Sequence, residues 1–324
     1  MMRLFITACA LCLLAAAAAA QPSGRDRTDT RPQRATPQQP ALPPVRTPPG
    51  DRPLTVFTSA ASVFDTNINH DEEDALESLG MVLAAGARFR DDPWDPAVDL
   101  TYTMGFHRYM RTDQWDRLSH HVRAVVEAEL SGPWTFETVG EVSLKGTSED
   151  RELSDQYLIN PRLAYRFGER HRVRLYGALR AKRYGEDLLR NATNRYVGAE
   201  VQFRSTDGKR VEVGGRLEGN DAVGPRNDYS RSTYYTEFLA PVSSHDQIEL
   251  ELTVRTQQYL TRRVENSSRL LRRDRRWIPS FAWVRALTPD SDLEVAYRLE
   301  SRTSNDPDKT FNAHLFSVSV LRRW

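Results

Sequence analysis

The chain has 324 residues, of which 39% are hydrophobic and 27% are charged, and its formal net charge is +1. This near-neutral balance gives no reason to expect a nucleic-acid partner. The composition is typical of a soluble protein, but it does not exclude a membrane β-barrel, because barrel strands alternate apolar and polar residues and dilute the average.

The N-terminus has the pattern of a cleaved export signal. Arg3 provides a positive charge, and the apolar stretch after it ends in alanines. Ala18-Ala19-Ala20 followed by Gln21 fits a small-residue cleavage site. A permanent membrane anchor is the alternative, although the apolar stretch is short for one. We therefore expect residues 1–20 to be a signal peptide.

The segment that follows differs sharply in composition. Residues 21–53 are rich in Pro, Arg, Gln and Thr and have almost no large apolar side chains. Such a segment cannot bury enough surface to become ordered, so we expect a disordered, Pro-rich periplasmic linker. Both cysteines, Cys9 and Cys12, precede it within the signal, which excludes disulfides and thiolate metal sites from the mature chain.

Residues 54–324 consist of short alternating stretches. In Val98–Phe106 every second residue is large and apolar, which is typical of a strand with one apolar and one polar face. Ile248–Val254 and Leu293–Leu299 repeat the pattern. No run of eighteen apolar residues follows Ala20, so we expect no transmembrane helix.

Fourteen such stretches occur along the chain. We predict strands at 54–64, 76–90, 97–109, 119–131, 134–146, 155–167, 172–184, 194–204, 209–219, 230–240, 247–259, 275–287, 291–302 and 311–324. Tilted strands of about ten residues have the length that a bilayer requires. The number and length of the stretches therefore favour a membrane barrel over a periplasmic β-sandwich, which would also leave sheet edges open.

The connections between the stretches alternate in length. Those after the even-numbered strands are short and contain Pro, Gly and Asp, as in Ser131-Gly132-Pro133. The others are mostly longer and polar, at 65–75, 110–118, 147–154, 185–193, 220–229, 260–274 and 303–310. Short periplasmic turns and longer outer loops are typical of bacterial outer-membrane barrels. We predict an all-β, antiparallel up-and-down transmembrane β-barrel of about 14 strands in the outer membrane, with both termini periplasmic.

The last strand ends in an aromatic residue, Trp324. This ending resembles the C-terminal signal that barrel-assembly machinery recognises, although Arg322 interrupts the alternation. We therefore expect contact with that machinery, with outer-membrane lipid and with lipopolysaccharide, and we expect no contact with nucleic acid. The Pro-rich linker leaves room for a periplasmic partner.

If the apolar face of each strand meets lipid, the other face lines the lumen. On the sixth and seventh strands this face carries a basic wall of Arg162, Arg166, Arg172, Arg174, Arg180 and Lys182. Acidic residues on the lumen face of other strands include Glu127, Glu129, Glu137, Glu141, Glu249 and Glu251. These charges would either select solutes, with the basic wall guiding anions, or pair across strands and simply stabilise the barrel.

The histidines near the third and fourth strands offer the main enzymatic signal. His107, His120 and His121 lie close to Ser119 in the sequence, and Asp116 could join two of the histidines at a loose metal site. No spacing fixes a Ser-His-acid triad or a metal motif. We therefore predict no catalytic residues, no metal and no cofactor.

Two short motifs resemble known barrel families. Ser62–Asn69 resembles the opening of the β-barrel porin family and of the barrel domain of the surface lipoprotein assembly modifier family. Tyr297–Asn305 resembles the penultimate strand of the same groups. The assembly-modifier resemblance implies a fourteen-strand barrel that helps lipoproteins reach the cell surface. That family carries tetratricopeptide repeats before its barrel, and residues 21–53 contain no such repeat.

From these features we expect a porin-like outer-membrane channel for the passive passage of small hydrophilic solutes, without enzymatic activity. The alternative is an export or assembly barrel for a surface lipoprotein or polysaccharide that works with a periplasmic partner. A structural or adhesive barrel with a blocked lumen is a third candidate.

Overall fold

The computed structural model describes residues 53–70, 75–91, 96–111, 116–147, 153–168, 170–185, 187–265, 267 and 269–324. The predicted signal peptide, and all of the predicted linker except Pro53, lie outside the described residues. Among the residues that are described, no helix combines the length and the apolar character needed to cross a membrane.

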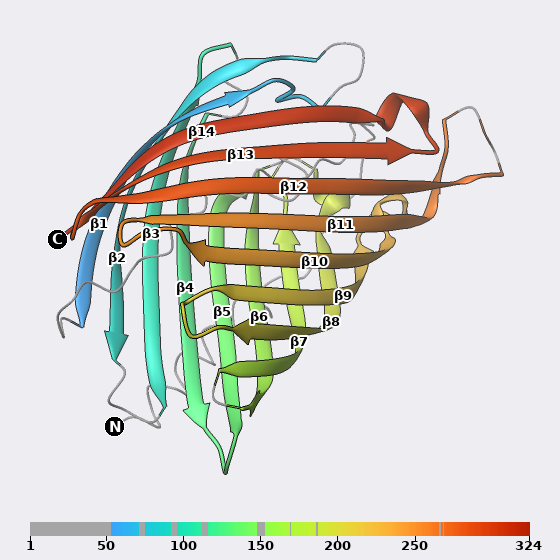
Figure 1. Ribbon diagram of the computed structural model, residues 1–324. Helices are drawn as coiled ribbons and strands as arrows, with labels where there is room; N and C mark the ends of the chain where they lie inside the picture. The colour runs from blue at the N-terminus through green and yellow to red at the C-terminus, as the bar shows by residue number, and fades with distance from the viewer. Residues whose placement is uncertain are drawn as a thin grey trace.

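Fourteen antiparallel strands form one closed barrel (Figure 1). The strands are β1 (Leu54–Asp65), β2 (Ser78–Asp91), β3 (Ala97–Tyr109), β4 (Arg117–Glu129), β5 (Trp134–Thr147), β6 (Leu153–Phe167), β7 (His171–Arg183), β8 (Ala192–Arg204), β9 (Arg210–Ala222), β10 (Tyr229–Pro241), β11 (Asp246–Arg263), β12 (Leu271–Thr288), β13 (Ser291–Ser304) and β14 (Phe311–Arg323). Each strand pairs with its neighbours in the chain, and β1 closes the barrel against β14. This arrangement confirms the predicted up-and-down barrel.

Short 3-10 helices lie in three of the longer connections. They are η1 (Leu188–Arg190), η2 (Pro225–Asn227) and η3 (Pro307–Lys309). All three belong to connections that follow odd-numbered strands, which are the connections that the sequence predicted to be long and polar. They therefore lie at the end of the barrel opposite to the start of β1 and the end of β14. We call this end of the barrel the loop end.

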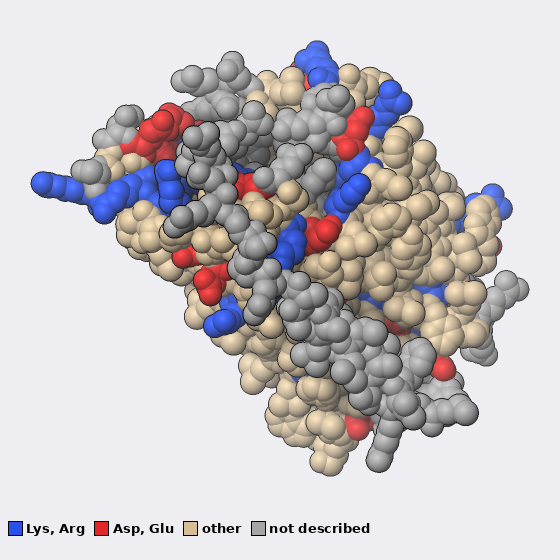
Figure 2. Space-filling model, turned by 180° about the vertical axis from the view of Figure 1, so that it is seen from behind, with Lys and Arg blue, Asp and Glu red and all other residues tan. Residues whose placement is uncertain are grey.

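The alternation of residue types separates an outer from an inner face. In β3, Leu100, Met104 and Phe106 are 39–42% exposed, whereas Thr103 and His107 are 5% and 2% exposed. Apolar side chains that remain exposed around a closed sheet are what a lipid-facing surface requires. Tan side chains, which carry no charge, make up most of the described surface on the face seen in Figure 2.

The predicted strand bounds agree with the structure to within a few residues, except around the loop predicted at 260–274. There β11 continues to Arg263, β12 begins at Leu271, and each strand has 18 residues. A register shift between Gln258 and Arg263 interrupts the alternation of β11. The period-2 pattern is lost at such an irregularity, so the extended strands looked like a loop in the sequence.

Candidate functional site

The register of β6 and β7 places the six residues of the basic wall on the inner face. Arg166 stands opposite Arg172, and Arg180 and Lys182 occupy even-numbered positions of the same strand as Arg172. Arg174 is 8% exposed and Lys182 is 2% exposed, which is the burial expected of the inner face. The six side chains differ, however, in the partners that surround them.

Arg174 is closely matched by carboxylates of the next two strands. Its Nε lies 2.6 Å from Oε1 of Glu200 on β8, and its Nη2 lies 3.4 Å from Oε2 of Glu212 on β9. The Tyr235 hydroxyl donates to Glu200 at 2.5 Å, and the Gln202 amide donates to Glu212 at 3.0 Å. The positive charge of Arg174 is therefore largely neutralised within the inner face.

Glu200 was missed by the sequence analysis. Its strand was predicted at 194–204 from the alternation of residue types, and no charge pattern singled out Glu200 within it. Only the register, which sets Glu200 opposite Arg174, reveals the pair. A comparison of inward charges on adjacent strands at matching register could have found it.

Pairing also occurs at the seam between the acidic and basic strands. Nη1 of Arg162 on β6 lies 2.9 Å from Oε1 of Glu137 on β5. Nearby, Nε of Arg123 lies 3.3 Å from Oε1 of Glu141. These contacts are of the stabilising kind that the sequence raised as an alternative to solute selection.

Arg166 and Arg172 are arranged differently. They face each other directly across β6 and β7. Arg166 is exposed and Arg172 is partly exposed. Neither side chain forms a hydrogen bond or an ion pair with another described residue, and the buried Nε of Arg172 has no hydrogen-bond partner among them. The Arg180 guanidinium lies 5.7 Å from the centre of the Tyr196 ring. Arg166 and Arg172 are thus the basic-wall residues best placed to meet a solute.

The remaining acidic residues are also distributed unevenly. Glu127 and Glu129, near the end of β4, are exposed. Glu249 and Glu251 are partly buried on β11 and accept side-chain hydrogen bonds of 2.8 and 2.7 Å from neighbours on the same strand. The six acidic residues therefore do not form one continuous wall.

Aromatic side chains of the inner face lie across glycines of the adjacent strand. Tyr176 crosses Gly198, and Tyr235 crosses Gly214. A Cβ atom added at Gly198 would stand 2.5 Å from the Tyr176 hydroxyl. These glycines let the rings lie along the barrel wall, an arrangement that also stabilises strand pairing.

The histidine group that the sequence raised as a possible enzymatic signal is divided between the two faces of the sheet. His120 Nδ1 lies 2.9 Å from the Tyr102 hydroxyl, whereas His121 Nδ1 lies 2.7 Å from the Ser143 hydroxyl. As adjacent residues of one strand, the two histidines point to opposite faces of the sheet. Ser119 donates to a backbone carbonyl, that of Gly105, at 3.3 Å.

A second charged group, which we call the rim cluster, lies at the loop end of β12 and β13. It consists of Arg272, Asp274, Arg302 and Ser304. Asp274 accepts hydrogen bonds of 3.1 and 3.0 Å from Arg272, one of 2.7 Å from the Ser304 hydroxyl, and one from Arg302. Arg272, Arg302 and Asp274 are 0–2% exposed. Arg272 and Asp274 fall within the loop predicted at 260–274, so this cluster was not predicted from the sequence.

No protein-family model and no curated protein sequence matches the chain. The outer membrane channel DcaP of Acinetobacter baumannii is similar in structure, with a TM-score of 0.52, 9% identity and coverage of 84% of this chain and 96% of that chain. The anion-selective porin from Comamonas acidovorans has a TM-score of 0.51, 8% identity and coverage of 84% and 98%. The chain has the fold of outer-membrane β-barrels. Membership of the porin or assembly-modifier families stays a prediction.

Proposed function

We propose that the protein is a porin-like outer-membrane channel through which small hydrophilic solutes pass passively. The observation that carries this proposal is a closed fourteen-strand barrel with apolar side chains exposed outside and charged side chains inside. Barrels of about eight strands are filled by side chains, whereas porins of about sixteen strands leave an aqueous channel. The exposure of inward residues, partial for Arg172 and greater for Glu127, supports a lumen that contains water.

Within this channel, Arg166 and Arg172 are proposed to guide anionic solutes. A charge in a barrel lumen must be either hydrated or paired, and these two arginines form no ion pair with a described residue. Arg174, by contrast, is matched by Glu200 and Glu212. That one protein of similar structure is an anion-selective porin is consistent with this proposal.

Planar-bilayer conductance of the purified protein tests both parts. We expect stable channels with an anion preference. The double variant Arg166→Glu, Arg172→Glu should lower the anion-to-cation permeability ratio at least about fivefold, because two unit charges about 4 Å apart interact with about 1 kcal/mol in water. Arg285→Glu is the matched control, because Arg285 is an exposed arginine on the outer face of β12.

The two parts of the proposal fail in different ways. Protein that shows the heat-modifiable gel migration of a folded barrel but no conductance would refute the channel. Conductance with an unchanged permeability ratio in the double variant would refute the role of the two arginines and leave the channel standing. Nothing in the described residues favours the export or assembly alternative.

The location and orientation are part of the same proposal. We place the barrel in the outer membrane with both termini periplasmic, after removal of residues 1–20 and with residues 21–53 as a linker. The residues that end the chain after β14 fit recognition by barrel-assembly machinery, since Trp324 is 52% exposed and its ring centre lies 4.1 Å from the Arg322 guanidinium. Protease digestion of intact cells would cut the long loops if this orientation is correct and would spare them if it is inverted.

A groove on the outer face is the proposed contact with lipopolysaccharide. The groove lies at the loop end and has a volume of about 1010 Å³. Its lining includes Arg269, Arg273 and Arg275 beside Leu270 and Leu271. Arginines next to leucines suit a lipid that carries phosphates above acyl chains. Replacing the three arginines with alanine should reduce the lipopolysaccharide that copurifies with the barrel, and equal amounts would refute this contact.

A further inference from the structure

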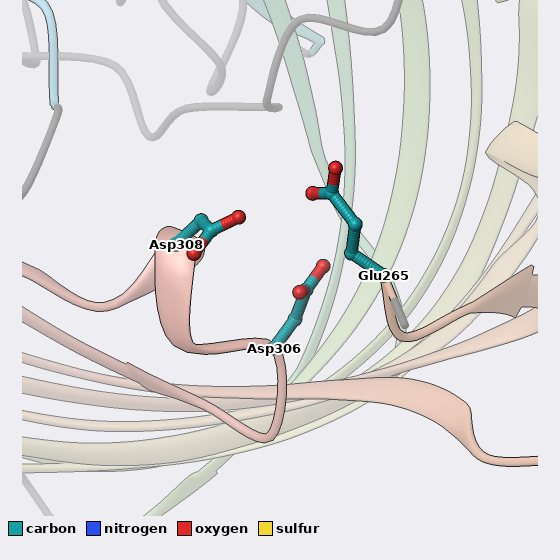
Figure 3. Close-up of side chains that lie close together, drawn as sticks. All are labelled: Glu265, Asp306 and Asp308. Atoms are coloured by element: carbon teal, nitrogen blue, oxygen red, sulfur yellow. The ribbon is translucent and has the colours of Figure 1, made fainter. Parts of the chain in front are cut away.

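Two loops at the loop end bring three carboxylates together. Glu265 follows β11, Asp306 precedes η3, and Asp308 lies within η3. One carboxylate oxygen of each residue lies within 4.8 Å of the others. Figure 3 shows the three side chains directed toward one another from the β11–β12 and β13–β14 connections. Like charges at this spacing repel, so a cation bound among them would be favourable.

The burial of Asp306 strengthens the case for a bound cation. Asp306 is 3% exposed, and its buried Oδ1 has no hydrogen-bond partner among the described residues. Arg272 lies close enough to interact electrostatically with Asp306, but its hydrogen bonds of 3.1 and 3.0 Å go to Asp274. A buried carboxylate oxygen without a donor is costly, because it has lost its contacts with water and gained none in return.

We propose that Glu265, Asp306 and Asp308 bind a divalent cation, and that this cation is Ca²⁺. The three ligands are hard oxygen donors, which suit Ca²⁺ or Mg²⁺ rather than a transition metal. Mg²⁺ demands near-ideal octahedral geometry, whereas Ca²⁺ accepts six to eight oxygens in irregular arrangements, with water completing the shell. One buried and two exposed carboxylates from separate loops fit the more permissive ion.

The bound ion would link two loops that are separated in sequence. Glu265 belongs to the connection that joins the long strands β11 and β12, and Asp306 and Asp308 belong to the connection after β13. Ca²⁺ between them would hold the two connections together at the mouth of the barrel. This role is independent of whether solutes pass through the lumen.

Calorimetric titration of the chelator-stripped, full-length barrel in detergent with CaCl₂ tests the proposal. We expect one Ca²⁺ per chain, with a dissociation constant of about 10⁻⁴ to 10⁻³ M, the range of extracellular calcium modules. Asp306→Asn and Asp308→Asn should each weaken binding at least tenfold. Asp290→Asn, at an exposed carboxylate of the β12–β13 turn at the opposite end, should leave it unchanged.

Each outcome decides the matter. Absence of saturable Ca²⁺ binding by the folded protein would overturn the site, and so would binding that is equally strong in the wild type and in Asp308→Asn. Asp308 is exposed, so its replacement tests the site even if Asp306→Asn fails to fold. Equal affinities for MgCl₂ and CaCl₂ would overturn the choice of Ca²⁺.

Discussion

The rim cluster and the turn end of the basic wall hold arginine side chains in opposite ways. In the rim cluster, Arg272 and Arg302 are almost fully buried and both donate to Asp274. In the basic wall, Arg166 and Arg172 face each other and form no ion pair with a described residue. Arginine is therefore buried and paired in one region, and in the other we propose that it is available to solutes.

The difference follows from the strands that carry these residues. The 18-residue strands β11 and β12 are the longest of the barrel, and the rim cluster connects the loop end of β12 to β13. Arg166 and Arg172 flank the short turn at the opposite end, and their neighbours across the sheet include no carboxylate directly opposite. Cross-strand register, more than the number of arginines, decides which charges are neutralised.

Replacing Asp274 should give the largest effect, because it removes the shared acceptor of two buried arginines. We expect Asp274→Ala to lower the free energy of unfolding by about 3–5 kcal/mol, the usual cost of breaking a buried ion pair. The urea midpoint of the lipid-reconstituted barrel, followed by tryptophan fluorescence and gel migration, measures this change.

An exposed pair provides the control for that variant. Glu77 lies 3.0 Å from Arg111, and both side chains are more than half exposed. Glu77→Gln should change the free energy of unfolding by less than about 1 kcal/mol, as solvent screens such pairs. Similar losses in the two variants would mean that the rim cluster is no more stabilising than a surface pair.

A smaller loss of folding stability should follow from adding one methyl group beside the basic wall. In Gly198→Ala the new Cβ would stand 2.5 Å from the Tyr176 hydroxyl and 2.6 Å from the Gly215 carbonyl oxygen. Overpacking of this kind costs about 1–3 kcal/mol. If Tyr176 yields by swinging off the wall, single-channel conductance should fall as well.

Gly219→Ala, on the outer face of the neighbouring strand β9, is the control. A Cβ at Gly219 meets nothing within 4 Å, so this variant should keep the stability and conductance of the wild type. Equal behaviour of the two alanine variants would show that the contact between Tyr176 and Gly198 does not shape the lumen beside the basic wall.

The fold could be predicted from the sequence because lipid and water impose a period of two on each strand. Val98–Phe106 shows this pattern without interruption, and its strand was predicted with the bounds that the structure has. The pattern fails where the backbone is irregular. The register shift after Gln258 therefore concealed the extension of β11 and, with it, the extension of β12.

The candidate site could be predicted only in part. Alternation indicated which side chains face inward, including Arg162 and Arg174, because this depends on one strand at a time. Pairing depends on two strands in register, so the contact between Arg174 and Glu200 was not predictable from either strand alone. Likewise, nothing in the sequence indicated that Glu265 would meet Asp306, since their contact depends on two loops.

A moderate change in ion selectivity should distinguish arginines that carboxylates neutralise from arginines that are available to solutes. In Glu200→Gln, Arg174 loses the carboxylate 2.6 Å away and keeps only Glu212, at 3.4 Å. We expect the anion-to-cation permeability ratio, from reversal potentials in a salt gradient, to rise by up to about fivefold. A ratio equal to that of the wild type would show that Arg174 lies outside the path of the ions, whatever its pairing.

The smallest effect is expected at a pair in open water, in the turn between β8 and β9. The Lys209 ammonium, 2.7 Å from Asp207, and the Ser205 hydroxyl both donate to this carboxylate and lower its pKa from 3.8 to about 2. Because the folded pKa is depressed, the stability contributed by Asp207 is complete above pH 3.8 and is lost as the pH falls through about 2.

Carboxyl-carbon NMR titration of Asp207 measures that pKa directly. Lys209→Met should return the midpoint toward 3.8, and the urea midpoint at pH 7 should fall only as far as the measured change in pKa requires, because the two are linked. A wild-type midpoint already near 3.8 would contradict the expected hydrogen bonds. A midpoint only slightly below 3.8 would show that short distance alone does not make a charge pair stabilising, and that the burial of the rim cluster is what distinguishes it.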